Sequence, residues 1–175
     1  ATAPATLTNL AAGFDLLGMA LTEPKDIITL HKRSDTALNI KLKHNNTDIP
    51  LDPTTNTASV AIAAMLEDLQ LQIGFDIMIN KGIDLESGLG GSAASAVAAI
   101  TACNAFLQQP LSLDQLLIHA AVAEKKITNC ICDNAAAALW GGCVLVGVNN
   151  HIIPLPAVPG TILITKPILK INTKM

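Results

Sequence analysis

The chain contains 175 residues, of which half are apolar and 14% are charged, and its formal net charge is −3. A chain of this length and apolar content can bury a sizeable core, which excludes intrinsic disorder. The slight negative charge, the lack of a basic run and an aromatic content of 2% make nucleic acid and anionic membranes poor candidates as partners.

The first half of the chain is predicted to form three strands and one helix. Apolar residues recur with a period of two in the strands and at helical spacing in the helix. Asn56 or Thr57 is the expected N-cap of that helix. The predicted strands cover 27–33, 37–43 and 74–80, and the helix covers 57–70.

The second half is predicted to begin with helices and end with strands. Ser112 is the expected cap of the middle helix, and Gly141-Gly142 would end the last one. Helices and strands are intermixed without regular alternation, which favours an α+β fold over a doubly wound sheet. The predicted helices cover about 92–107, 113–125 and 133–140, and the strands cover 143–147, 151–155 and 161–165.

Three features bear on the compartment and on metal binding. No long apolar stretch is free of polar breaks, so no transmembrane helix is expected. The first residues, ATAPATLTNL, do not have the pattern of a signal peptide. Cys130 and Cys132 have a C-x-C spacing unlike a zinc site, so we expect buried thiols in a reducing, cytoplasmic compartment.

The segment ESGLGGSAAS, residues 86–95, places several glycines directly before a helix. Helix N-termini carry unpaired N–H groups and a partial positive charge, and glycines allow the backbone to approach an anion closely. The segment is neither a Walker A loop nor a dinucleotide fingerprint. From the residues alone, an anion-binding loop and an ordinary structural turn are both open.

Three motifs together resemble those of the GHMP small-molecule kinases, and among them the homoserine kinases. APATLTNLAAGFDLLGMAL, DLESGLGGSAAS and AEKKITNCICDNAAAALWGGCVLV occur in the family's order. The resemblance implies an α+β two-layer fold like domain 2 of ribosomal protein S5. It also implies transfer of the γ-phosphoryl group of ATP to the hydroxyl of L-homoserine, in threonine biosynthesis, with Mg²⁺. A homodimer is possible.

The resemblance also implies roles for particular residues. Ser92 and Glu124 match the magnesium ligands, Asn134 matches the asparagine beside the reacting hydroxyl, and the neighbouring Asp133 is a candidate base. Without the motif, Glu124 would read as a solvated helix end, and Asp133 and Asn134 as helix caps. The nucleotide-binding residues implied are Asn56, Lys81, Ser87, Gly88, Leu89, Gly90, Gly91, Ser92 and Ala93.

The substrate amino acid would contact Asn9 and Asp15, near the start of the chain, and Thr173, near its end. A carboxylate can hold the substrate ammonium group, and an amide can bond its hydroxyl or carboxylate. Turn formation is the alternative for Asn9 and Asp15, and an exposed surface lysine is the alternative for Lys81.

Several residues depart from the family pattern. Asp84 replaces a proline and Gly91 a serine in the loop, Ala11-Ala12 replace G-P, and Asn129 and Ile131 replace glycine and histidine. We expect residues 1–165 to form the N-terminal ATP-binding domain and 166–175 to begin a connection to a C-terminal domain missing from the chain. The alternatives are another GHMP kinase, such as a mevalonate-pathway kinase, or a catalytically degenerate nucleotide-binding or regulatory homologue.

Overall fold

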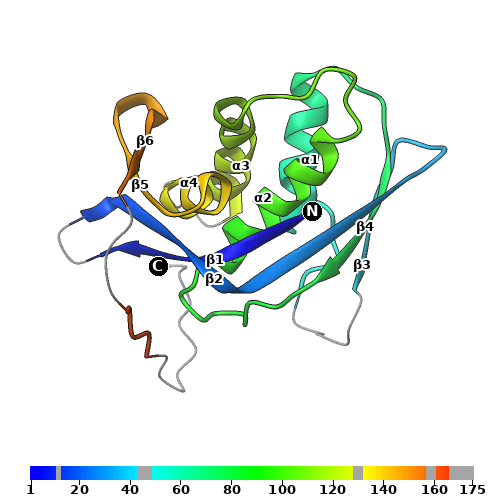
Figure 1. The fold of residues 1–175 in the computed structure, drawn as a ribbon. Helices are drawn as coiled ribbons and strands as arrows, with labels where there is room; N and C mark the ends of the chain where they lie inside the picture. Colours follow the sequence, from blue (N-terminus) through cyan, green and yellow to red (C-terminus); the bar gives the residue numbers. More distant parts are fainter. Residues whose placement is uncertain (11–12, 43–48, 128–131, 157–160, 166–175) are drawn as a thin grey trace.

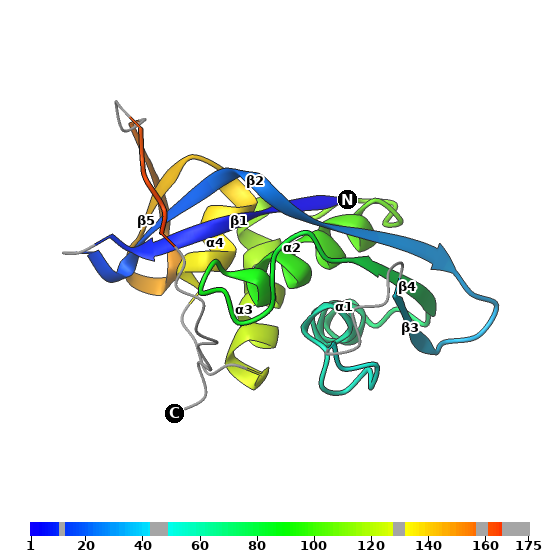
Figure 2. The same ribbon diagram turned by 90° about the horizontal axis from the view of Figure 1, so that it is seen from below.

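The computed structural model describes residues 1–10, 13–42, 49–127, 132–156 and 161–165. It consists of two layers, with one sheet covered on one face by all four helices of this part of the chain (Figures 1 and 2). The prediction of a two-layer α+β fold is confirmed. Where the structure is described, none of the helices combines the length and apolar character needed to cross a bilayer.

The sheet is organised around one long strand, β2 (Gly13–Lys32). Its first half pairs antiparallel with β5, its second half pairs antiparallel with β4, and β1 pairs along it from Thr2 to Asn9. The remaining strand pairs are β3 with β4, which are parallel, and β5 with β6, which are antiparallel. The other strands are β1 (Thr2–Asn9), β3 (Leu38–Leu42), β4 (Phe75–Asn80), β5 (Cys143–Val146) and β6 (Ile152–Leu155).

The helices pack through an alanine-rich central member, α2 (Gly91–Asn104). Ten of its residues are buried, because it lies on the sheet and also contacts α1, α3 and α4. Small side chains allow this close approach, and apolar residues of β2 and β4 complete the core. The other helices are α1 (Thr57–Asp68), α3 (Leu113–Ile127) and α4 (Asp133–Trp140).

Local capping explains where two of the helices begin. Asn56 Oδ1 accepts a hydrogen bond of 3.0 Å from Ala58 N, which makes Asn56 the N-cap of α1. Ser112 and Gln115 exchange side-chain and backbone hydrogen bonds at the start of α3, a capping box. The predicted cap at Ser112 is therefore confirmed, and of the two candidates for α1, Asn56 is the cap.

Three sequence-based expectations need correction or extension. The strand expected at 27–33 is only the end of β2, and β1 was not predicted. Residues 161–165 form no strand, because they do not pair with the sheet. The proposed boundary between 1–165 and 166–175 stays a prediction, since 166–175 lie outside the described residues, as do Ala11-Ala12, Asn129, Cys130 and Ile131.

Candidate active site

The glycine-rich segment forms a loop between β4 and α2. Glu86, Gly88 and Gly90 have φ angles of 54°, 71° and 64°. Such left-handed backbone conformations favour glycine. Gly90 is the N-cap residue of α2, and no side chain caps this helix. The helices α1 and α3 have side-chain caps, whereas α2 and α4 do not. The first N–H groups of α2, which follow the glycine loop directly, are suited to an anionic ligand.

The first strand holds this loop in place. Thr6 N donates a hydrogen bond of 3.0 Å to Leu89 O. A Cβ atom at Gly90 would collide with the Thr6 hydroxyl oxygen and would lie 2.5 Å from Asn134 Oδ1. Gly90 is therefore required for close packing as well as for its backbone conformation. The loop, β1 and the start of α4 meet at this point.

Ser92 and Glu124, the two predicted magnesium ligands, lie next to each other. Glu124 is 3% exposed. Burial raises the pKa of its carboxyl group to about 7; the neighbouring Ser92 hydroxyl opposes this rise, and the charge of Asp133 adds to it. The fold thus brings a hydroxyl from the first turn of α2 against a carboxyl near the end of α3. Glu124 is not the solvated residue that its sequence neighbours suggest.

Asp133 and Asn134 form the first turn of α4 and lie beside the loop. Asp133 is buried, and burial raises the pKa of its carboxyl, partly opposed by hydrogen bonds with Asn134 N and the Thr8 side chain. Asn134 Oδ1 accepts a 2.7 Å hydrogen bond from Thr6 Oγ1. Both residues lie in the first helical turn, after the N-cap Cys132, so they are not the cap itself.

Asn9 is the last residue of β1, and Asp15 lies near the start of β2. Both have positive φ angles, 70° and 58°, and Asp15 N donates a 2.9 Å hydrogen bond to Asn9 Oδ1. Both residues nevertheless belong to strands, Asn9 to β1 and Asp15 to β2. Asp15 is also close enough for its charge to raise the pKa of Asp133, so the start of β2 lies near the start of α4.

Other predicted site residues have structural partners instead. The Lys81 side chain is 6% exposed, so it is not a surface lysine, and it forms an ion pair with Asp26. Asn56 is 4% exposed, and its Nδ2 donates to Pro50 O at 2.9 Å. Direct nucleotide contact by Lys81 or Asn56 stays a prediction. Thr173 lies outside the described residues.

The donor set around Ser92 fits a magnesium ion. Magnesium prefers hard oxygen ligands, and it typically takes one or two from the protein and the rest from phosphates and water. Glu124 and Ser92 offer a carboxylate and a hydroxyl at the end of the glycine-rich loop. Within the described ranges, no cluster of three acidic, histidine or cysteine side chains could hold a metal alone, so phosphate oxygens would have to complete the coordination.

Sequence reasoning missed three residues near this site: Thr6, Thr8 and Asp26. Thr6 and Thr8 are in the APATLTN motif, and their side chains alternate with Leu7 along β1. The alternation of side chains in this segment is visible in the sequence. It does not reveal that Thr6 contacts Asn134 and Thr8 contacts Asp133, which are far away in the sequence. Asp26 follows a proline and a lysine and resembles an exposed turn residue, yet it is fully buried.

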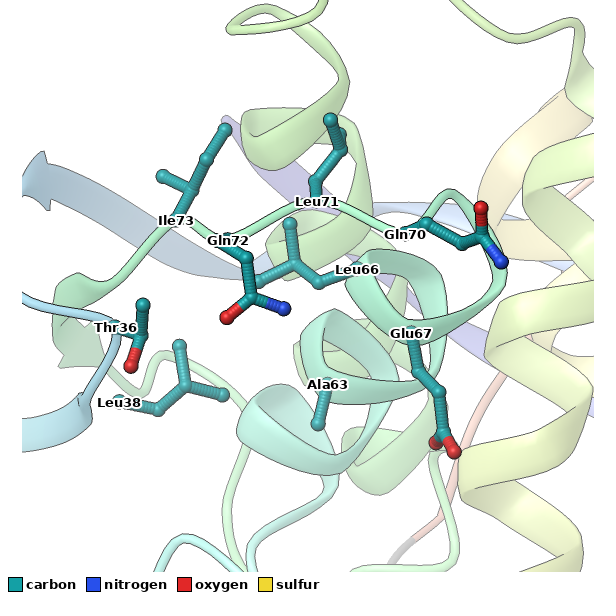
Figure 3. A pocket seen from close by; sticks show the side chains of 9 residues that line it. All are labelled: Thr36, Leu38, Ala63, Leu66, Glu67, Gln70, Leu71, Gln72 and Ile73. Carbon is teal, nitrogen blue, oxygen red and sulfur yellow. The ribbon is translucent and has the colours of Figure 1, made fainter.

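A shallow depression of about 500 Å³ lies elsewhere, at the C-terminal end of α1 (Figure 3). The opposite end of α1 is near the candidate site, where Thr57 Oγ1 donates to Ser92 O at 3.3 Å. None of the predicted site residues lines the depression. Its lining residues are Thr36, Leu38, Ala63, Leu66, Glu67, Gln70, Leu71, Gln72 and Ile73.

A glycine loop at a helix N-terminus without a side-chain cap, beside a buried hydroxyl and acid, is an arrangement suited to binding an anion. Residues 56–142 match the family described as GHMP kinases N terminal domain, and the chain belongs to this family. This match includes the loop, Ser92, Glu124, Asp133 and Asn134.

The curated relatives that it matches include proteins named homoserine kinase. The chain is 40% identical over 159 residues to that of Xanthomonas campestris pv. campestris (strain B100), covering 90% of this chain and 49% of the relative. It is 39% identical over 157 residues to that of Chlorobium phaeobacteroides (strain DSM 266 / SMG 266 / 2430), covering 82% and 49%. The chain thus spans about half the length of these relatives.

Solved structures agree with this assignment. The crystal structure of homoserine kinase from Cytophaga hutchinsonii matches with a TM-score of 0.83 and 35% identity, over 89% of this chain and 50% of that one. The mevalonate kinase of Methanococcus jannaschii matches with a TM-score of 0.69 and 18% identity, over 90% of this chain and 55% of that one. The second likeness shows a shared fold only.

Proposed function

We propose that this chain is the nucleotide-binding half of a homoserine kinase, which transfers the γ-phosphoryl group of ATP to the hydroxyl of L-homoserine. The observation that carries the proposal is the convergence of the glycine loop, the Ser92–Glu124 pair and the Asp133-Asn134 turn. These groups come from separate parts of the chain, and together they supply the groups that phosphoryl transfer needs. The names of the relatives favour homoserine as the acceptor.

In the proposed arrangement, the loop from Ser87 to Ala93 binds the triphosphate through backbone N–H groups. Glu124 and Ser92 would hold a magnesium ion, which when bound neutralises phosphate charge. The positive end of the α2 dipole adds to the attraction of the phosphate groups. Gly91 keeps this backbone function, although it has no hydroxyl group. A Cβ atom there would lie 3.2 Å from Ile83 Cγ2, which is a tight contact.

The acceptor would bind between the β1–β2 turn and the start of α4. The Asp15 carboxylate would pair with the substrate ammonium group, and the Asn9 amide would bond the substrate carboxylate. Asn134 would orient the reacting hydroxyl. The hydroxyl oxygen attacks the γ-phosphorus, the bond from that phosphorus to the β–γ bridging oxygen breaks, and ADP leaves. The hydroxyl proton passes to Asp133, whose raised pKa favours its acceptance.

The test is an assay of the complete gene product for ADP release with L-homoserine, with mevalonate and without an acceptor. Stimulation by homoserine alone is the expected result. Stimulation by mevalonate instead would assign the protein to another GHMP branch. Binding of magnesium-ATP without turnover on any acceptor would favour a catalytically degenerate homologue. Among the described residues, Asp84 and Gly91 are the departures from the family pattern that motivate this alternative.

A further inference from the structure

Asp26, on β2, forms hydrogen bonds to residues at both ends of the proposed phosphate-binding loop between β4 and α2. It is fully buried. Its Oδ1 accepts hydrogen bonds from Gly82 N and Ile83 N, both 3.1 Å long, where the chain enters the loop. Its Oδ2 accepts from Ser95 Oγ at 2.7 Å, in α2, just beyond the loop. One carboxylate therefore ties the two ends of the loop to the sheet.

Lys81 completes this network from the end of β4. Its Nζ donates to Asp26 Oδ2, to Gly91 O at 2.8 Å and to Ser95 Oγ at 3.0 Å. Burial lowers the pKa of the Lys81 ammonium group, and Asp26 opposes the shift. The positive charge is thus directed at the protein's own carboxylate and at the first residue of α2. These bonds hold the loop backbone in place. They do not use the first backbone N–H groups of α2, which have no side-chain cap.

Burying the Asp26–Lys81 ion pair costs free energy, and a gain in the stability of the fold is not a sufficient reason for the pair. Two charges have been removed from water, and the desolvation penalty of a buried pair is often as large as the attraction between its members. A well-packed apolar pair would often stabilise the fold as much. The specific result here is that four hydrogen bonds to one carboxylate fix the spacing between residues 82–83 and 95.

We propose that Asp26 is a positioning residue for the phosphate loop, acting through Lys81 and Ser95 to hold the N-terminus of α2 in the conformation that receives the triphosphate. This inference rests on the proposed function and deepens it. Because Asp26 is fully buried, it would act on the nucleotide only through the loop. Its removal should allow the loop to depart from the binding geometry, and small displacements of positioned groups have large effects on binding and turnover.

The main test uses Asp26→Asn in the full-length protein. The expected result is a nucleotide Kd raised on the order of tenfold or more, measured with a non-hydrolysable magnesium-ATP analogue. Backbone amides of residues 83–91 should exchange with deuterium faster than in the wild type. The affinity for homoserine, measured without nucleotide, should change by less than about twofold, since Asn9, Asp15 and Asn134 are not among the hydrogen-bond partners of Asp26.

The matched control is Asp76→Asn. Asp76 is on β4 and forms ion pairs with Arg33 at 2.7 Å and Lys41 at 2.8 Å. Its side-chain hydrogen-bond partners Arg33, Asn39 and Lys41 all lie outside the loop. Both variants remove a carboxylate from a network of ions. Asp76→Asn should lower Tm without changing the nucleotide Kd or the exchange of 83–91. Equal nucleotide affinities in the two variants would overturn the positioning role.

Ser95→Ala keeps the inference testable if Asp26→Asn does not fold. It removes one hydroxyl and leaves the ion pair in place, and it should raise the nucleotide Kd by about threefold to tenfold. An unchanged Kd in Ser95→Ala would overturn the inference. If the wild type binds the analogue but does not phosphorylate homoserine, the proposed function fails while the affinity and exchange measurements still decide the role of Asp26. If the wild type binds no nucleotide, both fail.

Discussion

The Thr6 hydroxyl donates a 2.7 Å hydrogen bond to Asn134 Oδ1, across 128 positions of the sequence. This hydrogen bond fixes the orientation of the Asn134 amide. Its Oδ1 points toward β1, and its Nδ2 therefore points away from β1. Its Nδ2 lies 3.3 Å from Asp133 Oδ1. The same threonine binds Leu89 O through its backbone, so a single residue positions both the loop and the asparagine.

Thr6→Val should therefore reduce kcat by about threefold to tenfold, since a single hydrogen bond contributes roughly 0.5–1.5 kcal/mol. Valine has the shape of threonine but no hydroxyl, so the packing of β1 should be preserved. Thr6→Ser is the control, because it retains the donor. The measurement is steady-state kinetics with magnesium-ATP and homoserine. Equal kcat values in the valine and serine variants would contradict an orienting role for this hydroxyl.

Gly90→Ala and Gly88→Ala form a second matched pair. Both glycines have positive φ angles, 64° and 71°, so alanine costs about 1–2 kcal/mol of backbone strain at either site. Only at Gly90 would the added Cβ collide with Thr6 and Asn134. We expect Gly90→Ala to abolish nucleotide binding and lower Tm further than Gly88→Ala. Indistinguishable effects would show that the close approach seen at Gly90 has no consequence. Thermal unfolding and nucleotide titration measure both.

Magnesium-dependent binding should require the Ser92–Glu124 pair. Glu124→Gln should weaken magnesium-dependent nucleotide affinity by at least about tenfold, as even outer-shell changes at metal sites do, and Ser92→Ala should weaken it less. Nucleotide affinity measured with EDTA should be similar in the two variants and the wild type. The titration is made with and without magnesium. Ser92→Ala with unchanged magnesium-nucleotide affinity would show the assignment of Ser92 to be wrong.

The buried Glu124 carboxyl should also affect stability in the absence of magnesium. Its pKa is about 7 in the folded chain against an ordinary value of 4.5, so between these pH values the folded state binds more protons than the unfolded state. The free energy of unfolding should then fall as pH rises from about 4.5 to 7, by at most about 3 kcal/mol. The contribution is fully present below pH 4.5.

Glu124→Gln should remove this part of the pH dependence. Urea unfolding at pH 5 and pH 7.5, with EDTA present, provides the comparison. The wild type should lose stability between the two values relative to the glutamine variant. A parallel response of the two proteins would mean that Glu124 ionises normally in the fold.

Much of the fold follows from local patterns. The period of two in Phe75, Ile77 and Ile79 predicted β4, and the side-chain cap at Asn56 predicted the start of α1. β1 and the first half of β2 could not be predicted in this way, because glycine, proline and acidic residues interrupt the alternation between 13 and 26. Pairing with neighbouring strands keeps that segment extended. Residues 161–165 show the reverse case, in which a strand-like pattern finds no partner.

The residues of the candidate site were predicted from sequence motifs, but the residues that hold them in position were not. Ser92, Glu124, Asp133 and Asn134 come from short segments with a recognisable order. The Asp26–Lys81–Ser95 network has no such signal, because its three members lie on β2, at the end of β4 and within α2. Only the three-dimensional fold shows that an aspartate after a proline is buried under the loop.

The double attachment of Thr6 also constrains when the site can form during synthesis. During translation β1 is synthesised first, whereas the partners of Thr6, Leu89 and Asn134, are synthesised much later. Closing such long loops is entropically costly and slow. The phosphate loop therefore reaches its final shape only after α4 has been made. A nascent chain stalled before residue 134 would have the glycines in place and still bind nucleotide poorly.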